Sequence, residues 1–272
     1  MKKILIFVLT IAAFASCNLE NEIDLNLPEF ESQLVVECYL EPGKPYRANL
    51  FRTTSYYAPT SDLLNSIVQD ATVIITYQGV ADTLLTGLYI DGSNLYAYGS
   101  STIVPADYTG DFFLEVIDNA GNRITATTKI APPIQLDSIQ TEPLSLLNDS
   151  TLVVITFSQE NPAIKNFYRR MQYRTDASET DSLKVDFVVN DEITSNGQLV
   201  LGTPPIFVRG DTMVIQYMEI TEDFYEYVES REALESANGN PFAQPGVLKT
   251  NIIGGIGIFT GFTPTQQTYY LQ

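Results

Sequence analysis

Short runs of alternating apolar and polar residues, separated by turn residues, make up most of the chain from residue 33 onward. Residues 34–40 and the β-branched run at 71–77 show this strand pattern most clearly. Further strands are predicted at residues 46–54, 82–88, 94–98, 112–117 and 123–130. Because turn signals separate these short strands, the pattern predicts an immunoglobulin-like or transthyretin-like β-sandwich over residues 33–131.

Ala131-Pro132-Pro133 interrupts the pattern, since two successive prolines do not fit inside a central strand. We therefore expect a domain boundary here and a second β-rich domain over residues 134–272. Its predicted strands lie at residues 134–140, 152–157, 166–175, 183–189 and 211–217. Residues 250–261, which are apolar and rich in glycine, predict a strand pair or a bulged strand.

One helix is predicted near residues 221–238. Thr221 can cap its start, and Glu222 and Asp223 suit the positive end of the helix dipole. Gly239 would end it. One stripe of the helix carries Phe224, Tyr227, Val228, Arg231 and Leu234.

The first 17 residues predict export of the protein and its attachment to a membrane. Lys2 and Lys3 precede an apolar run of about 11 residues, which suits a signal peptide and is shorter than the about 20 residues of a membrane span. Ala15-Ser16-Cys17 resembles the bacterial lipobox, so we expect residues 1–16 to be removed and Cys17 to carry the lipid anchor. The alternative is ordinary secretory cleavage, with Cys17 incidental.

Residues 17–32 form a polar tether with acidic residues at Glu20, Glu22 and Asp24. This tether resembles the export signal of Bacteroidota lipoproteins that face outward from the outer membrane. A solvated linker is the alternative, and the side of the membrane stays open.

Composition narrows the classes of function. The chain has 15 Lys and Arg against 33 Asp and Glu, a formal charge of −18, which argues against nucleic-acid binding. It contains no histidine, so histidine-dependent catalysis and histidine-ligated zinc are excluded. No nucleophile motif is recognisable, and we expect neither an enzyme nor a cofactor. If Cys17 is lipidated, Cys38 is the remaining thiol, expected as a small buried hydrophobe.

Two loops carry oxygen ligands that calcium could use, at residues 91–94 and 118–122. Neither has the spacing of an EF-hand, so ordinary turns are favoured and no metal site is predicted. Gly255-Ile256-Gly257 lacks the third glycine of a dinucleotide-binding loop and is interpreted as structural.

Two groups of residues are candidates for contact with a partner or ligand. Tyr56 and Tyr57 lie in a long loop, where binding residues are common. Arg169, Arg170 and Arg174 cluster in a chain with few cations, and strand alternation would place Arg169 on one face and the other two on the opposite face. The alternative for the arginines is pairing with the chain's own carboxylates.

A further pattern resembles the Bacteroidota O-glycosylation sequon, in which Asp precedes Ser or Thr and then a small or aliphatic residue. The alternative is that such pairs begin strands after turns. The candidate acceptors are Thr83, Ser138, Ser150, Ser182 and Thr212.

Several motifs together resemble an uncharacterised Bacteroidota outer-membrane lipoprotein family, whose members are generally encoded beside TonB-dependent transporters. The matching motifs are Glu22-Ile23-Asp24-Leu25, Asp70-Ala71-Thr72-Val73, Asn240-Pro241-Phe242 and Gly254-Gly255-Ile256-Gly257-Ile258-Phe259. The resemblance implies a surface partner of such a transporter and supplies no catalytic residues.

The sequence thus leads to two hypotheses. The first is a non-enzymatic accessory or binding subunit of a TonB-dependent transporter, which captures or gates a substrate whose identity, small molecule or peptide, stays open. The second is a structural or assembly factor of the outer membrane without a soluble ligand.

Overall fold

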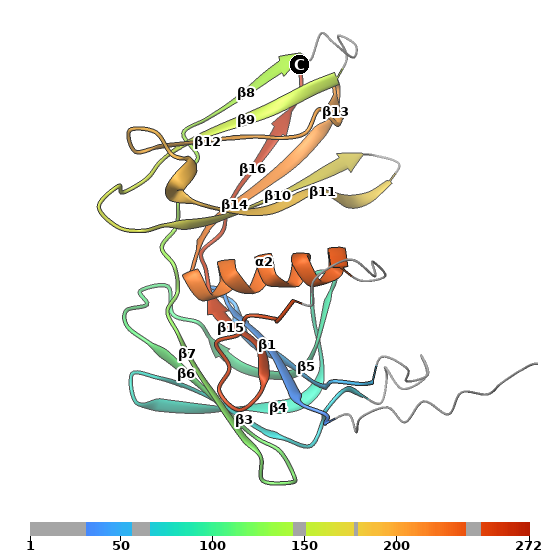
Figure 1. Ribbon diagram of the computed structural model, residues 1–272, viewed down its shortest axis with the longest axis vertical. Helices are drawn as coiled ribbons and strands as arrows, with labels where there is room; N and C mark the ends of the chain where they lie inside the picture. Colours follow the sequence, from blue (N-terminus) through green and yellow to red (C-terminus); the bar gives the residue numbers. More distant parts are fainter. Residues whose placement is uncertain (1–30, 56–65, 144–150, 177–178, 238–245) are drawn as a thin grey trace, which may run out of the picture. The chain divides into compact units, whose positions relative to one another are not determined.

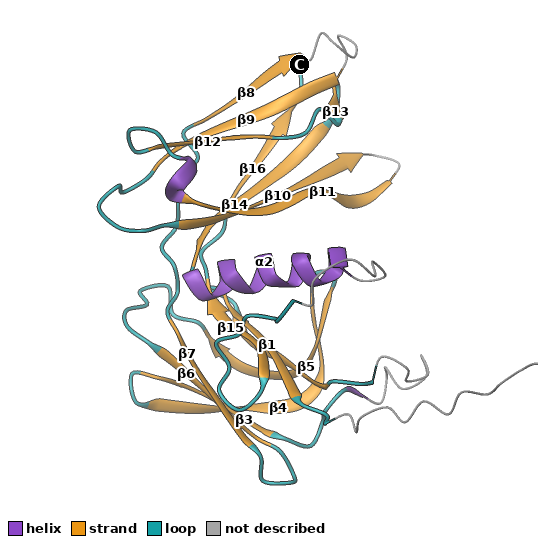
Figure 2. Ribbon diagram, viewed as in Figure 1, coloured by secondary structure: helices purple, strands orange, loops and turns teal. Residues whose placement is uncertain are grey.

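The computed structural model describes residues 31–55, 66–143, 151–176, 179–237 and 246–272. Within it, Ser32–Gln272 forms one compact unit. The described residues are mainly β-strand with one α-helix, as the sequence predicts (Figures 1 and 2).

The first part of the chain, together with β15 from near the C-terminus, forms a single sheet with the strand order β15-β1-β2-β5-β4-β3-β6-β7. Backbone bridges Thr125↔Ile253 and Ile130↔Gly261 then connect the β7 side of this sheet to the β15 side. The sheet is therefore a nearly closed barrel, and the predicted two-sheet sandwich is not confirmed. Its strands are β1 (Leu34–Leu40), β2 (Pro45–Arg52), β3 (Thr72–Tyr77), β4 (Val80–Asp91), β5 (Asn94–Ile103), β6 (Phe112–Ile117), β7 (Arg123–Thr128) and β15 (Ile256–Gly261).

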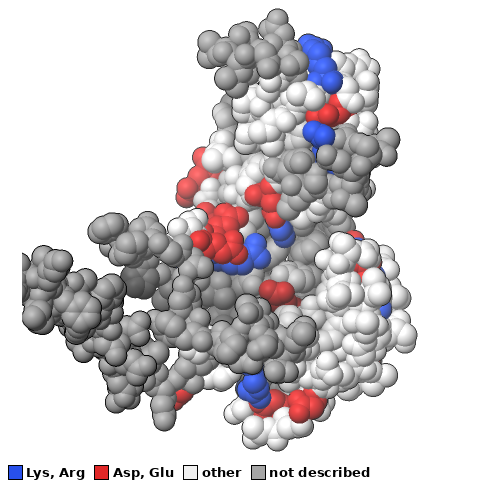
Figure 3. Space-filling view, turned by 90° about the vertical axis from the view of Figure 1, so that its right-hand side faces the viewer, with Lys and Arg blue, Asp and Glu red and all other residues white. Residues whose placement is uncertain are grey.

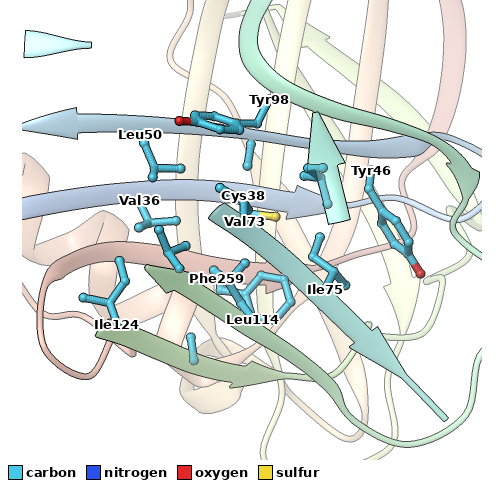
Figure 4. Close-up of a cluster of buried hydrophobic side chains, with 14 of the residues drawn as sticks. Val36, Cys38, Tyr46, Leu50, Val73, Ile75, Tyr98, Leu114, Ile124 and Phe259 are labelled. Atoms are coloured by element: carbon cyan, nitrogen blue, oxygen red, sulfur yellow. The ribbon is translucent and has the colours of Figure 1, made fainter. Parts of the chain in front are cut away.

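Alternation along β1 separates its two faces. Val36 and Cys38 point into the barrel core, where they pack with Val73, Leu114 and Phe259 (Figure 4). Cys38 is the small buried hydrophobe that the sequence predicts, and burial raises the pKa of its thiol to about 12, which keeps it in the unreactive neutral form. The intervening side chains of Glu37 and Tyr39 are half-buried on the opposite face.

The glycine-rich segment near the C-terminus completes the barrel. β15 pairs with β1 in parallel, with Gly257 opposite Val36. A Cβ at Gly257 would lie 2.0 Å from the carbonyl oxygen of Val36, and its φ of +117° also favours glycine. Glycine here is thus required by close backbone approach. The sequence predicted a strand at this place, but in the second region and without its pairing to β1.

Gly257→Ala should destabilise the protein by about 2–6 kcal/mol, because overpacking adds to backbone strain. Gly202→Ala is the matched control, since the nearest atom to its added Cβ lies at 3.7 Å and its φ is not positive. Chemical denaturation of both variants measures the difference. Equal stability of the two variants would contradict the role given to Gly257.

The remaining strands form two four-stranded sheets. One has the order β11-β10-β14-β16, and the other has β12-β9-β13 with β8 beside β9. Their bounds are β8 (Ser138–Pro143), β9 (Thr151–Gln159), β10 (Phe167–Asp176), β11 (Glu179–Asn190), β12 (Gln198–Gly202), β13 (Phe207–Val208), β14 (Thr212–Ile220) and β16 (Thr265–Tyr270). Strands β12, β13 and β16 were not predicted. β8 starts at Ser138, so the strand expected from residue 134 begins too early.

The predicted helix is α2 (Glu222–Ala237). The Thr221 hydroxyl accepts a hydrogen bond from the Phe224 N–H at 3.3 Å, which confirms the cap. Phe224, Tyr227 and Val228 are buried, in a cluster that also contains Phe167 of β10 and Ile258 of β15. The helix thus packs against both the barrel and the β10–β14 sheet (Figure 2).

The loop at residues 118–122 is a turn, as the sequence favours. One carboxylate oxygen of Asp118 accepts from the backbone N–H groups of Ala120 and Asn122, and the other from the side chains of Asn122 and Arg52. The hydrogen bonds from Asn122 and the guanidinium of Arg52 hold the pKa of the buried Asp118 carboxyl at about 2.

Asp118→Ala should therefore lower stability by about 1–3 kcal/mol near pH 7, because buried donors lose their acceptor. A lowered pKa in the folded state stabilises above the ordinary value of 3.8 and loses that contribution as the pH falls toward about 2. The free energies of unfolding of Asp118→Ala and of the wild type should consequently converge as the pH falls over this interval. Asp107→Ala, at an exposed loop position, is the control and should show no such convergence.

Candidate functional site

A cleft of about 340 Å³ opens between the outer face of the barrel and the β10–β14 sheet. Strands β1, β2, β4 and β5 and the turns beside them contribute Glu37, Tyr39, Lys44, Arg47, Asp91 and Tyr96. Strands β10 and β14 contribute Arg169, Met171, Tyr173, Gln216 and Met218. Its volume falls at the lower end of the range for small-molecule sites, about 300–1,000 Å³.

Strand alternation builds this cleft. In β1 and β2 the even-numbered residues fill the barrel core, so the odd-numbered Glu37, Tyr39, Arg47 and Asn49 project from the opposite face. In β10 the odd-numbered Arg169, Met171 and Tyr173 do the same toward the cleft. The predicted division of the arginine cluster between two faces is therefore confirmed for Arg169 and Arg170.

Arg169 is held by its own chain while it lines the cleft. Its Nε and one terminal nitrogen donate to the two carboxylate oxygens of Asp186 at 2.8 and 2.7 Å. Its guanidinium also lies 5.5 Å from the ring centre of Phe224 in α2. Both partners restrict the side chain, so Arg169 lines the cleft in a fixed position.

Arg170 points away from the cleft, and the prediction that it contacts a partner or ligand is wrong. Its side chain is fully buried between the two four-stranded sheets, where it donates to the carbonyl oxygen of Leu201 at 2.8 Å and to Gln172 at 2.7 Å. Desolvation lowers the pKa of the guanidinium to about 10. Strand alternation directs Arg170 into the interior, so its role is to connect β10 to β9 and β12.

Arg174 lies on the face of Arg170, half-buried, with its Nε 4.0 Å from a carboxylate oxygen of Asp211. Tyr56, Tyr57, Cys17 and Ser150 fall outside the described residues. Thr83 and Ser138 are exposed on β4 and β8, and Thr212 is half-buried at the start of β14. Ser182 belongs to β11. Glycosylation at these acceptors stays a prediction.

Two of the cations that line the cleft, Lys44 and Arg47, are held by neighbouring groups. Lys44 pairs with Glu41 at 2.9 Å and with Asp91 at 3.4 Å. Arg47 donates to the backbone oxygens of Tyr46 and Ser100, and it stacks 4.5 Å from the ring centre of Tyr89. Over the visible face of the molecule, cations likewise lie beside carboxylates (Figure 3).

Sequence reasoning identified Arg169 but missed the rest of the cleft. Its other polar members, among them Asn49, Tyr96 and Gln216, are single polar residues within strands. These residues could have been found by listing, for each predicted strand, the side chains on the face that points away from the core. Combining those faces requires the pairing of distant strands, which alternation alone does not specify.

The described residues contain no group of three or more His, Cys, Asp or Glu side chains arranged to hold a metal ion. Among the same residues, no helix has the length and apolar character needed to cross a membrane. The arrangement in the cleft is suited to binding, through aromatic rings, amides and fixed charges.

A double-mutant cycle on Arg169 and Asp186 should give a coupling free energy of about 0.5–3 kcal/mol, because the pair is bidentate and both side chains are less than a quarter exposed. The variants are Arg169→Met, Asp186→Asn and their combination, measured by denaturation. Arg231 and Glu235 on α2 form the control pair; they are 38% and 71% exposed, so their coupling should stay below about 0.5 kcal/mol. Equal coupling in the two cycles would refute the fixed position of Arg169.

Comparison with known proteins supplies a family. The family model described as Domain of unknown function (DUF4249) matches residues 20–268, and the chain belongs to that family. No curated protein matches the chain.

Proposed function

We propose that this DUF4249 member is a non-enzymatic binding protein, tethered to the outer membrane through Cys17, that acts as an accessory subunit of a TonB-dependent transporter. In this role it captures a soluble substrate on the membrane surface and passes it to the transporter. The observation that carries the capture step is the cleft between the barrel and the β10–β14 sheet.

Two further observations support the proposal. The leader and Ala15-Ser16-Cys17 resemble those of bacterial lipoproteins, and the motif resemblance implies a neighbouring transporter. Binding also suits the chemistry of the cleft, where Arg169 and Lys44 are already paired with carboxylates and no histidine exists to serve as a general base.

The test is affinity purification of the tagged protein from detergent-solubilised outer membranes, followed by mass spectrometry. We expect one TonB-dependent transporter to co-purify and Cys17 to carry acyl chains. Cys17→Ala should release the protein from the membrane fraction and abolish co-purification, because a single anchor provides the attachment. Cys38→Ala is the matched control, since that thiol is buried and unreactive.

A monomer that purifies alone would contradict the transporter role. A deletion strain that grows poorly on every carbon source, with no defect specific to one nutrient, would favour the alternative of a structural or assembly factor.

A further inference from the structure

We infer that the cleft binds an uncharged, polyhydroxylated ligand of the size of a disaccharide. This inference rests on the proposed function and names its substrate class. Three properties of the cleft support it. The charges of its lining residues cancel, the backbone groups of its strands are already paired, and its side chains combine aromatic rings with planar polar groups.

The first property is charge. The acidic residues Glu37, Glu41 and Asp91 and the basic residues Lys44, Arg47 and Arg169 line the cleft in equal number, in a chain with more than twice as many acids as bases. The terminal groups of Lys44 and Arg169 are already paired with carboxylates. An anion would therefore have to displace these partners, and a charged ligand gains little here.

The second property is the state of the backbone. β1 lies between β15 and β2, β2 between β1 and β5, and β10 and β14 each between two other strands. Because these strands pair on both sides, their backbone groups are not free for an extended peptide, which binds by adding to an open edge. Recognition in this cleft must come from side chains.

The third property is the mixture of side chains. Tyr39, Tyr96, Tyr173 and Phe262 supply ring surface, and burial raises the pKa of each of the three tyrosines, so their phenols stay neutral. Sugar rings present apolar C–H faces that suit aromatic surfaces and hydroxyls that both donate and accept.

Suitable polar groups stand beside these rings. The side-chain amides of Asn94 and Gln216 have no hydrogen-bond partner among the described residues. Within that same part of the chain, Glu37 forms no ion pair, and its carboxylate accepts only the long bond of 3.3 Å from Tyr227. The buried Nε of Arg47 also lacks a partner there. These donors and acceptors match alcohol groups, and a buried unpaired donor is expected to find a partner.

Isothermal titration of the mature protein in detergent tests the inference. The probes are uncharged disaccharides (maltose, cellobiose, xylobiose, mannobiose and galactobiose), with digalacturonate and tetra-alanine as a charged and a peptide probe. We expect at least one uncharged disaccharide to bind, and neither of the other two. Gln216→Ala and Tyr96→Ala should each weaken that binding about threefold to tenfold, the loss expected for one hydrogen bond or one ring contact.

Gln267→Ala is the matched control, because this exposed glutamine lies on β16 and does not line the cleft. Binding of only digalacturonate or tetra-alanine, no binding by any of the disaccharides, or equal affinity of all three variants would each overturn the inference. The titration contains no transporter. Saccharide binding without co-purification would therefore contradict only the transporter role, and co-purification without saccharide binding only the ligand class.

Discussion

The structure depends on the parallel pairing of β1 with β15, which joins the first described strand and a strand near the C-terminus in one sheet. β1 is placed between β2 and β15, so its backbone hydrogen bonds are satisfied on both sides. Its inner face then fills the barrel, while its outer face carries Glu37 and Tyr39 to the cleft. One face of β1 thus contributes to the core and the other to the cleft. The lack of a side chain at Gly257 permits the close approach of β15 to β1.

Local patterns predicted much of this fold because burial imposes a period of two on each strand. The runs that form β1, β3, β6 and β7 were found close to their final bounds, as were α2 and its cap. β16 was missed because Thr265–Tyr270 has no apolar alternation, and only its pairing with β14 makes it a strand. β13 is too short to give a pattern.

The candidate site was predicted only in part, for a related reason. Alternation separated Arg169 from Arg170, but it did not show which side faces the interior. That outcome is set by the sheet of β9 and β12, which covers Arg170, and by α2 and Asp186, which hold Arg169. Such partners are distant in sequence. Whether a polar residue on a strand lines a cleft or faces solvent depends on how the sheets pack. The cleft was not predicted because the sequence pattern does not give that packing.

The burial of Arg170 has a consequence for how the molecule responds to acid. Its guanidinium stays ionised throughout acidic and neutral pH, and its partners are carbonyl, amide and hydroxyl oxygens, which do not titrate. The junction of β10 with β9 and β12 therefore contains no proton-sensitive contact at Arg170, whereas the turn at Asp118 does. Acidification toward the pKa of Asp118, about 2, would therefore weaken this hairpin of the barrel and leave the Arg170 contacts between the two four-stranded sheets in place.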